Sequence, residues 1–455
     1  MSTKKFYMVS LGCAKNLVDT EKIGGNLCRE GYKPTANLAD ADLAIINTCA
    51  FLKSARRESI SELAKIVRSK GKIDGKSPKI IMTGCLANYY NENKIKNILP
   101  GVDKTFPPAE YSSIPLYLHR TFHRKEPYPY NQQSGEQRLL TASPHSVYLK
   151  IADGCDNRCS YCLIPTLRGS LRSRKMEDIL AEARVLQELG AREINLVAQD
   201  TTAYGLDLYG KKMLGKLLQQ LCKIKGLVWI RILYTHPVHM DEELLDIIAT
   251  EKRVCNYIDI PLQHVSNPIM HHMGRGTTTK QIAALYEKIR SIIPGVTLRT
   301  TVMVGYPTEG KEEFDELLLF LRNYPFERLG AFVFSAERGT RAFTETKQVP
   351  PELAQERHRL VMEQQALISR GFNRRLLGKR CTVLVDTVNS TGRKVTARLP
   401  SQAPEVDGKV IVSGSGKYER GMFKMVTITG IGTYNLLATA ATKYTGEEKD
   451  KKIKD

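Results

Sequence analysis

The stretch Cys155-Asp-Asn-Arg-Cys159-Ser-Tyr-Cys162 places three thiols on one short segment of the chain. It follows Val147–Ile151, the first of six β-rich runs that alternate with helical patterns between residues 147 and 372. Alternation of strands and helices predicts a parallel sheet, and six such units predict a complete or partial barrel of the TIM type. Such barrels hold their ligands with the loops at the carboxyl ends of the strands. We therefore expect the three cysteines to lie at the mouth of a barrel.

The spacing C-x3-C-x2-C suits three irons of a 4Fe-4S cube, because thiolates are the usual ligands of iron–sulfur clusters. No fourth cysteine lies nearby in the sequence. The remaining iron would then be free to bind an exchangeable molecule, as an open catalytic metal position does. A zinc site with three cysteine ligands is the alternative interpretation.

Three further cysteines, Cys13, Cys49 and Cys85, are spaced 36 residues apart in the first part of the chain. Each follows directly on a predicted strand, and these strands are Lys5–Ser10, Leu43–Asn47 and Lys79–Thr83. Because the carboxyl ends of parallel strands share one edge of a sheet, we expect the three thiols to converge. Gly12 and Gly84 permit tight turns beside two of them. This arrangement predicts a second 4Fe-4S cluster with one open iron, and three buried structural cysteines are the alternative.

The sequence divides the chain into five parts. Residues 1–103 alternate β-rich runs with amphipathic stretches and predict an α/β domain with a parallel sheet. Residues 104–146 contain six prolines and lose this periodicity, so we interpret them as a linker. Residues 147–372 form the predicted barrel, which a long helix would close. Short β-rich runs and Gly-, Ser- and Asp-containing turns predict a small all-β barrel over residues 373–440, and residues 441–455 form a charged tail.

The composition favours a cytoplasmic protein that binds polyanions. The 455 residues carry a formal net charge of +20, which would attract RNA or a ribosome, and a solubilising surface is the alternative. No apolar run of about 18 residues and no secretory signal are found, so no membrane partner is expected. Ten cysteines in a reducing compartment indicate metal or redox chemistry rather than disulfides. The cysteines without a metal-site context, interpreted as core or neutral residues, are Cys28, Cys222, Cys255 and Cys381.

Two clusters with open irons imply two tasks, and this combination resembles the methylthiotransferase family of radical S-adenosylmethionine (SAM) enzymes. The resemblance covers nearly the whole chain, and its motifs besides the six cysteines are Leu11–Asn16, Asn47–Phe51, Ile164–Gly169 and Arg172–Arg174. It implies that SAM binds the barrel cluster, with Tyr161 and Gln199 as cofactor-binding residues. It also implies a second cluster that holds or donates sulfur, a low-potential electron donor, and a C-terminal TRAM domain that contacts the substrate. It assigns no catalytic side chain.

Several strings resemble the branch of this family that modifies a ribosomal protein, the RimO-type enzymes. These strings are Val197–Thr202, Tyr204–Gly205, Tyr234–Pro237, Gln263–His264 and, above all, Ala403–Gly408. The resemblance implies methylthiolation of the β-carbon of an aspartate in small-subunit ribosomal protein twelve, within a ribosome or during its assembly.

The charge of the C-terminal barrel favours RNA as a further partner. From Arg374 to Ala440 there are 11 Lys or Arg and 4 Asp or Glu, whereas a barrel that meets a basic ribosomal protein should be acidic. Two alternatives therefore stay open. One is a tRNA adenosine methylthiotransferase, and the other is a non-catalytic iron–sulfur factor that binds RNA or the ribosome.

Several polar residues near these motifs have two interpretations. Gln199 and Asp200 either bind SAM or cap the element that follows their strand. His236 and His264 are either functional or ordinary polar packing residues. The pair His271–His272 is interpreted as exposed rather than metal-binding.

One loop departs from the family pattern. The family's Gly-Phe-Pro-Gly-Glu-Thr appears here as Gly-Tyr-Pro-Thr-Glu-Gly over Gly305–Gly310. Because the loop glycine is displaced, we assign no SAM contact there.

Overall fold

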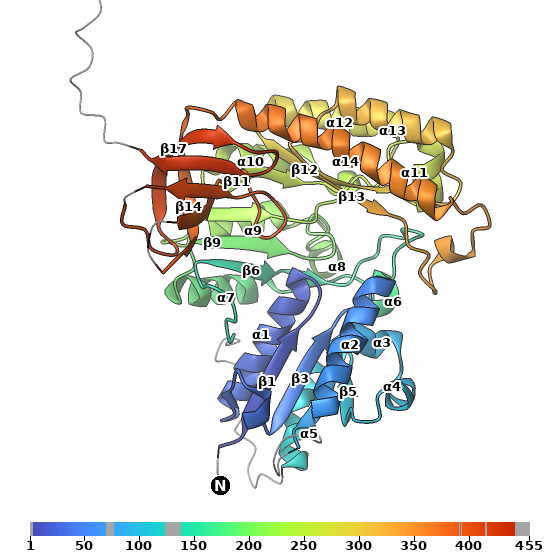
Figure 1. The fold of residues 1–455 in the computed structure, drawn as a ribbon, viewed down its shortest axis with the longest axis vertical. Helices are drawn as coiled ribbons and strands as arrows, with labels where there is room; N and C mark the ends of the chain where they lie inside the picture. The colour runs from blue at the N-terminus through green and yellow to red at the C-terminus, as the bar shows by residue number, and fades with distance from the viewer. Residues whose placement is uncertain are drawn as a thin grey trace, which may run out of the picture.

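The computed structural model describes residues 3–69, 77–122, 138–390, 392, 394–414 and 416–441. It contains two parallel sheets, a closed β-barrel and a two-stranded ribbon. In Figure 1 the N-terminal sheet, in blue, lies below the larger sheet, in green and yellow, and the closed barrel is drawn in red. Within this part of the chain, no helix combines the length and the apolar character needed to cross a membrane.

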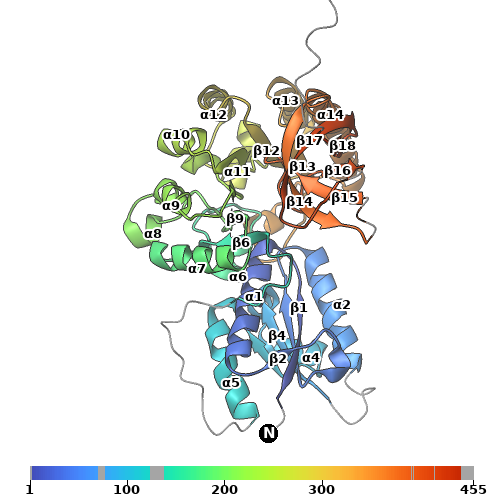
Figure 2. The same ribbon diagram turned by 90° about the vertical axis from the view of Figure 1, so that its left-hand side faces the viewer.

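The N-terminal sheet has five parallel strands in the order β2-β1-β3-β4-β5. The strands are β1 (Lys5–Ser10), β2 (Lys33–Pro34), β3 (Leu43–Thr48), β4 (Lys79–Gly84) and β5 (Lys104–Phe106). The covering helices are α1 (Ala14–Arg29) and α5 (Ile114–Thr121) on one face, and α2 (Lys53–Ser69) and α4 (Glu92–Ile98) on the other (Figure 2). All six residues of β3 are buried, as expected for a strand covered on both faces. The strand order reverses between β1 and β3, which is where ligand sites form in such sheets.

The structure differs from the interpretation of residues 104–146 as a linker. Their first three residues form the edge strand β5, which pairs with β4. Pro108 and Pro115 lie in the first turns of η2 (Pro108–Ser113) and α5, where the missing proline N–H has no intrahelical partner to lose. These prolines therefore mark helix starts rather than an irregular connection. Residues 123–137 of the expected linker lie outside the described residues.

The second sheet has six parallel strands in sequential order and does not close, so the predicted barrel is a partial one. The strands are β6 (Ser146–Lys150), β9 (Glu193–Val197), β10 (Trp229–Ile232), β11 (Val254–Asp259), β12 (Thr297–Val304) and β13 (Arg328–Val333). The helices along its outer side are α7 (Met176–Glu188), α9 (Leu214–Leu221), α10 (Glu242–Thr250), α12 (Thr279–Ile292) and α13 (Lys311–Asn323) (Figure 2). The long helix expected at the end is α14 (Pro351–Arg374), which packs against β13.

The C-terminal barrel is closed, with the strand order β14-β15-β16-β18-β17. Its strands are β14 (Arg380–Val388), β15 (Lys394–Arg398), β16 (Val410–Ser413), β17 (Phe423–Ile431) and β18 (Leu436–Ala440). Branched and small apolar side chains, mostly valine, fill its interior. The α/β fold class and the small all-β barrel expected from the sequence are therefore confirmed.

A buried ion cluster joins the closed barrel to the open one. Arg398 of β15 pairs with Glu193 of β9 at 2.6 Å and with Asp386 of β14 at 2.8 Å. Glu193 also pairs with Arg231 of β10 at 3.0 Å, and both of these side chains are fully buried. Burial alone would raise the pKa of Glu193, but the charges of Arg398 and Arg231 hold it at about 2. The closed barrel is thus fixed to the open barrel by charges that water does not screen.

The string Ala403–Gly408 takes part in the same attachment. The carboxylate of Asp407 accepts a hydrogen bond from the hydroxyl of Tyr257 at 2.7 Å and another from the backbone N–H of Ala403 at 2.8 Å. Ala403 is fully buried in a cluster that contains Tyr257 and Trp229 of the open barrel. The string that best marks the ribosomal-protein branch therefore docks one domain on another.

Replacing Arg398 by Leu should lower the free energy of unfolding by about 3–5 kcal/mol at pH 7, because it leaves the buried Glu193 with one of its two arginine partners. Urea denaturation would measure this loss. Since the folded state lowers the pKa of Glu193, the stabilisation is present above the unfolded value of about 4.3. It is lost as the pH falls toward the folded value of about 2. The difference in the free energy of unfolding between wild type and variant should therefore shrink as the pH falls through that range.

The matched control is Arg359→Leu. Arg359 also pairs with two carboxylates, Glu356 and Glu363, but on the exposed surface of α14. Such exposed pairs contribute little to stability, because water screens them. Equal losses in the two variants would contradict the importance of the buried cluster.

Candidate functional site

The three N-terminal cysteines lie together at the carboxyl edge of the N-terminal sheet. Cys13 follows β1 and precedes α1, Cys49 follows β3, and Cys85 begins α3 (Cys85–Tyr89) directly after β4. Cys49 and Cys85 are buried, whereas Cys13 is exposed. The strand register pairs Ser10 with Asn47 and Thr48 with Gly84, so the three cysteines that follow these strand ends share one small region. The structure thus brings together the three side chains whose convergence the sequence predicts.

Two glycines allow the cysteine turns to approach each other. Gly12 has a φ of 91°, and a Cβ at this position would lie 2.7 Å from the Cβ of Cys49. Gly84 has a φ of 98°, and a Cβ there would lie 2.3 Å from the carbonyl oxygen of Thr48. Both backbones are in the left-handed region, which glycine adopts without a steric penalty. Any larger residue would push the turns apart.

Two buried asparagines from the sequence motifs hold these turns in place. The side-chain amide of Asn16 donates to the carbonyl oxygens of Leu11 at 2.8 Å and Thr48 at 2.9 Å. The amide of Asn47 donates to the carbonyl oxygen of Asn16 at 2.8 Å and to the hydroxyl of Thr20 at 2.9 Å. The turn after β1 is therefore tied to the turn after β3.

The barrel cysteines lie at the carboxyl edge of the larger sheet, on the loop between β7 (Ala152–Asp153) and α6 (Ile164–Arg168). All three are half-buried. The guanidinium of Arg275 lies 3.6 Å from the Sγ of Cys159. Within the loop, the amide of Asn157 donates to the carboxylate of Asp200 at 2.8 Å. The loop is thus held by groups from other barrel strands.

The spacing of the thiols suits an iron–sulfur cube better than zinc. Among the described residues, only one group of three or more His, Cys, Asp or Glu has all its ligand atoms within 4.8 Å, and it contains no cysteine. Zinc, with bonds of about 2.3 Å to sulfur, would hold its thiolates about 3.8 Å apart. A cube of four irons and four sulfides separates its ligands more widely. Neither set of cysteines is therefore as compact as a zinc site requires, and three thiolates are a donor set that suits a 4Fe-4S cluster with one open iron.

The pKa values of the cysteine thiols are shifted in different directions by their surroundings. It raises the pKa of Cys85 and Cys155 to about 11 and that of Cys162 to about 12. Desolvation opposes ionisation of Cys13 too, but the charges of Lys15 and Arg168 and nearby backbone N–H groups lower the pKa of Cys13 below its usual value. The buried thiols would bind iron as thiolates, so cluster assembly would release protons.

The two residues expected to bind the cofactor lie at the same edge of the barrel. Tyr161 packs against a cluster that includes Met273 and Tyr306. Gln199 follows β9, and its amide nitrogen donates to the carboxylate of Asp153 at 2.9 Å. Its Oε1 is buried and has no hydrogen-bond partner among the described residues. Because an unpaired buried acceptor is costly, this oxygen is available to a donor group of a ligand.

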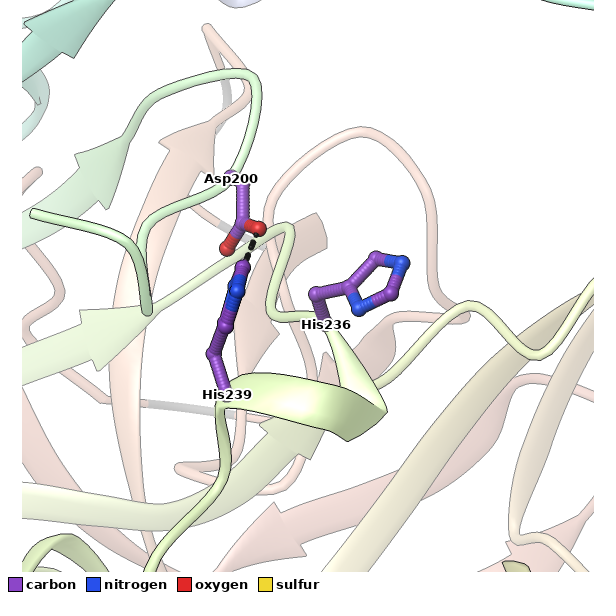
Figure 3. Close-up of side chains that lie close together, drawn as sticks. All are labelled: Asp200, His236 and His239. Carbon is purple, nitrogen blue, oxygen red and sulfur yellow. Dashed lines mark hydrogen bonds and ion pairs between the residues drawn. The ribbon is translucent and has the colours of Figure 1, made fainter. Parts of the chain in front are cut away.

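Asp200, His236 and His239 form the one described group whose ligand atoms all lie within 4.8 Å (Figure 3). One carboxylate oxygen of Asp200 accepts a hydrogen bond from the Nδ1 of His239 at 2.8 Å, and the other accepts one from the hydroxyl of Thr202 at 2.6 Å. The Nδ1 of His236 accepts a hydrogen bond from the backbone N–H of Val238 at 3.3 Å. These hydrogen bonds use the Nδ1 atoms of both histidines and both carboxylate oxygens of Asp200, whereas the Nε2 of His236 is buried without a partner among the described residues. The group therefore organises the loops around the barrel cysteines.

The other histidines of the motifs differ in burial. His236 and His264 are buried, and this burial lowers the pKa of each to about 3, so both are neutral. The Nδ1 of His264 accepts a hydrogen bond from the backbone N–H of Ser266 at 3.0 Å, which is an ordinary packing role. His271 and His272 are exposed, as the sequence analysis expects.

The loop that departs from the family pattern keeps a left-handed backbone. Thr308 stands where the family has glycine and has a φ of 70°. Its N–H donates to the carbonyl oxygen of Lys347 at 2.9 Å, and its hydroxyl lies 3.1 Å from the Nδ1 of His272. A threonine in this conformation is strained by roughly 1–2 kcal/mol. The surrounding structure therefore imposes the shape of this loop.

Sequence reasoning missed the buried charges that join the two cysteine sites. Arg168 of α6 contacts Cys85, Asp19 and Asp153, and Lys150 of β6 pairs with Asp19. The ion pair of Arg168 and Asp19 joins residues 149 positions apart, so no local spacing reveals it. Two features of the sequence could have indicated these buried charges. Arg168 lies inside a family motif, and Lys150 ends the largely buried strand β6.

Three family models match the chain in the order of its structural units. The model of the Radical SAM superfamily matches residues 149–321. The model described as Uncharacterized protein family UPF0004 matches residues 5–106, and that of the TRAM domain matches residues 377–441.

Solved structures share the fold of much of the chain. The radical S-adenosylmethionine methyltransferase TsrM from Kitasatospora setae is similar with a TM-score of 0.55 and 14% identity, over 73% of this chain and 75% of that one. The cobalamin-dependent S-adenosylmethionine radical enzyme OxsB is similar with a TM-score of 0.51 and 14% identity, over 80% of this chain and 56% of that one. At this identity the likeness shows the fold alone.

Curated relatives extend along nearly the whole chain. The chain is 40% identical over 431 residues to the ribosomal protein uS12 methylthiotransferase RimO of Elusimicrobium minutum, which covers 95% of this chain and 98% of the relative. It is 41% identical over 441 residues to the protein of the same name from Geobacter sulfurreducens, with 95% and 98% covered. Identity at this level, across all three units, shows common membership. The chain belongs to the radical SAM methylthiotransferases, in the family of the ribosomal protein uS12 methylthiotransferases.

Proposed function

We propose that the chain transfers a methylthio group to the β-carbon of an aspartate in ribosomal protein uS12, the twelfth protein of the small subunit, and that it uses SAM and two 4Fe-4S clusters. The observation that carries this proposal is the contact of α6, the helix that follows the barrel cysteines, with Cys85 of the N-terminal site through Arg168. The reaction needs one site that activates a C–H bond and another that supplies sulfur. Relatives about 40% identical, named as uS12 methylthiotransferases, support the choice of target.

The barrel site is suited to activating SAM. Cys155, Cys159 and Cys162 would hold three irons of a cluster whose open iron binds SAM, and reductive cleavage of SAM supplies a radical that removes hydrogen from an unactivated C–H bond. The protein positions this chemistry and excludes water from it. Arg275 directs its guanidinium at Cys159, and the buried Oε1 of Gln199 offers an acceptor to a bound ligand.

Tyr161 is the second residue proposed to contact the cofactor. Tyr161 lies between Cys159 and Cys162 in the sequence, so its ring would lie beside the cluster that these cysteines would hold. Burial raises the pKa of Tyr161 well above its usual value, so the phenol remains protonated. A neutral hydroxyl can donate a hydrogen bond beside the cluster without adding negative charge.

The N-terminal site is suited to holding sulfur near that radical. Cys13, Cys49 and Cys85 would bind the second cluster, whose open iron can carry an exchangeable sulfur atom. Helix α6 begins two residues after Cys162. Its last residue, Arg168, lies 3.2 Å from the Sγ of Cys85, so one short helix connects the two sites.

The target would meet the enzyme in a ribosomal or assembly context in the cytoplasm. Specificity comes from local contacts, whereas long-range charge governs encounter rate. The basic surface would therefore attract ribosomal RNA around uS12 without selecting the residue that is modified. A low-potential electron donor would reduce the barrel cluster.

A tRNA adenosine methylthiotransferase is the second candidate, because the C-terminal barrel carries 11 Lys or Arg against 4 Asp or Glu from Arg374 to Ala440. A non-catalytic iron–sulfur factor that binds RNA is the third. Reconstituted protein with dithionite separates this last candidate from the others, because only an enzyme would convert SAM to 5′-deoxyadenosine.

Replacing the barrel cysteines by Ala (Cys155, Cys159 and Cys162) should lower the iron content of the anaerobically reconstituted protein from about eight to about four per chain. SAM cleavage should be abolished, because the open iron is lost. Iron analysis and chromatography of 5′-deoxyadenosine would measure both effects. The control is a variant with Ala at Cys28, Cys222 and Cys381, which are half-buried and lie outside both sites. Retention of all iron by the first variant would show that the assignment is wrong.

Replacing Cys13, Cys49 and Cys85 by Ala should separate the two halves of the chemistry. SAM cleavage should survive, because the barrel cluster is intact, while methylthio transfer should disappear. Both can be measured on one sample, from the yield of 5′-deoxyadenosine and the mass of the target. If a folded variant that keeps the barrel cluster loses both activities, the two sites are not independent.

A strain that lacks the gene should contain uS12 lighter by about 46 Da, the difference between SCH3 and hydrogen in this cofactor-driven transfer. The missing mass should map to one aspartate, and the tRNA nucleosides should be unchanged. Mass spectrometry of ribosomal proteins and of digested tRNA would measure both. If uS12 keeps its mass and a methylthio-adenosine vanishes from tRNA, the second candidate is correct.

A further inference from the structure

Arg168 is a buried arginine that contacts the N-terminal cysteine site and Asp153, which precedes the barrel cysteines. It ends α6, which follows the barrel cysteines, and it is 3% exposed. Its Nε donates a hydrogen bond to the Sγ of Cys85 at 3.2 Å. Its terminal nitrogens contact Asp19 at 2.7 Å, Asp153 at 3.0 Å and the side chain of Asn16. One guanidinium therefore joins α1, α3 and the loop that precedes the barrel cysteines.

The carboxylates around Arg168 fix its orientation without using its Nε. Lys150 pairs with Asp19 and with Asp153, the latter at 3.1 Å, so two cations face two carboxylates. A guanidinium is planar, and two oxygens that bind its terminal nitrogen determine the direction of the remaining N–H groups. The hydrogen bond to Cys85 is therefore set by groups that do not contact the thiol.

A hydrogen-bond donor fixed in this way changes the electronic state of the sulfur to which it points. Hydrogen bonds and positive charge at a sulfur ligand stabilise the more negative, reduced state of an iron–sulfur cluster and raise its reduction potential. Cys85 is 6% exposed, so water screens the interaction little. The effect of Arg168 on Cys85 should therefore be large.

We propose that Arg168 is a positioning residue that raises the reduction potential of the N-terminal cluster and fixes this cluster beside the radical site. The proposal rests on the proposed function, because it requires a cluster on Cys13, Cys49 and Cys85. Arg168 belongs to the barrel by sequence and to the N-terminal site by contact. The electronic state of the sulfur-holding site thus depends on correct docking of the barrel.

The test is Arg168→Lys in the full-length protein with the barrel cysteines replaced by Ala, so that only the N-terminal cluster contributes to the signal. Lysine keeps a positive charge between Asp19 and Asp153 but has no second donor fixed toward Cys85. At the midpoint potential of the parent protein, the ratio of oxidised to reduced cluster should rise at least tenfold. That change equals about 59 mV for a one-electron couple. A redox titration followed by electron paramagnetic resonance measures this ratio without any assay of activity.

The matched control is Asn88→Ala in the same background. Asn88 of α3 donates to the carbonyl oxygen of Leu167 of α6 at 2.8 Å, so it spans the same interface without touching a thiol. Its removal should leave the ratio of oxidised to reduced cluster unchanged. Arg168→Gln, which removes the charge as well, should shift the ratio at least as far as Arg168→Lys.

Three results would overturn the proposal. The first is an unchanged ratio in Arg168→Lys, and the second is an equal shift in Asn88→Ala. The third is loss of the N-terminal iron from Arg168→Lys, which would make the arginine a requirement for assembly rather than a determinant of potential. Absence of any cluster from the parent protein without barrel cysteines would instead refute the proposed function.

Discussion

The carboxyl edges of two parallel sheets meet in this structure, and the buried charges between them are the constraint on which the rest depends. The N-terminal sheet gathers three cysteines because its parallel strands end at a common edge, whereas a single loop of the larger sheet carries the other three. The α6 helix that follows the barrel cysteines reaches Cys85 only if the edges are docked. Arg168, Lys150, Asp19 and Asp153 form that contact. Removing one of these charges would leave the buried cluster with an unbalanced charge, so the docked arrangement is strongly preferred over a displaced one.

A second buried ion cluster positions the C-terminal barrel. The ion pair of Arg398 and Glu193 connects β15 to β9, and the carboxylate of Asp407 accepts a hydrogen bond from the hydroxyl of Tyr257. The string that most distinguishes the ribosomal-protein branch, Ala403–Gly408, belongs to this contact. A sequence feature that distinguishes this branch of the family therefore helps to position the C-terminal barrel relative to the barrel cysteines. That geometry would determine which macromolecule reaches the reactive carbon.

Much of the fold could be predicted because its signals are local. The first, third and fourth strands of the N-terminal sheet follow from apolar runs, and the cysteine after each run identified the edge at which a site forms. The linker between the parallel sheets was misread in part, because prolines at helix starts resemble prolines in loops. Thr308 also escaped prediction, since its left-handed conformation is imposed by contacts with Lys347 and His272.

The sequence by itself determined the three units, the two sets of cysteines and the edge at which each set lies. These follow from the hydrophobic periodicity of strands and helices and from the positions of the cysteines directly after predicted strands. Only the tertiary structure decided that Arg168 points at Cys85, that Asp200 and His239 hold the barrel loop, and that Ala403–Gly408 serves domain docking. These contacts join residues that are far apart in the chain. Their energy comes from burial and charge pairing in the folded state, which no local pattern of side chains records.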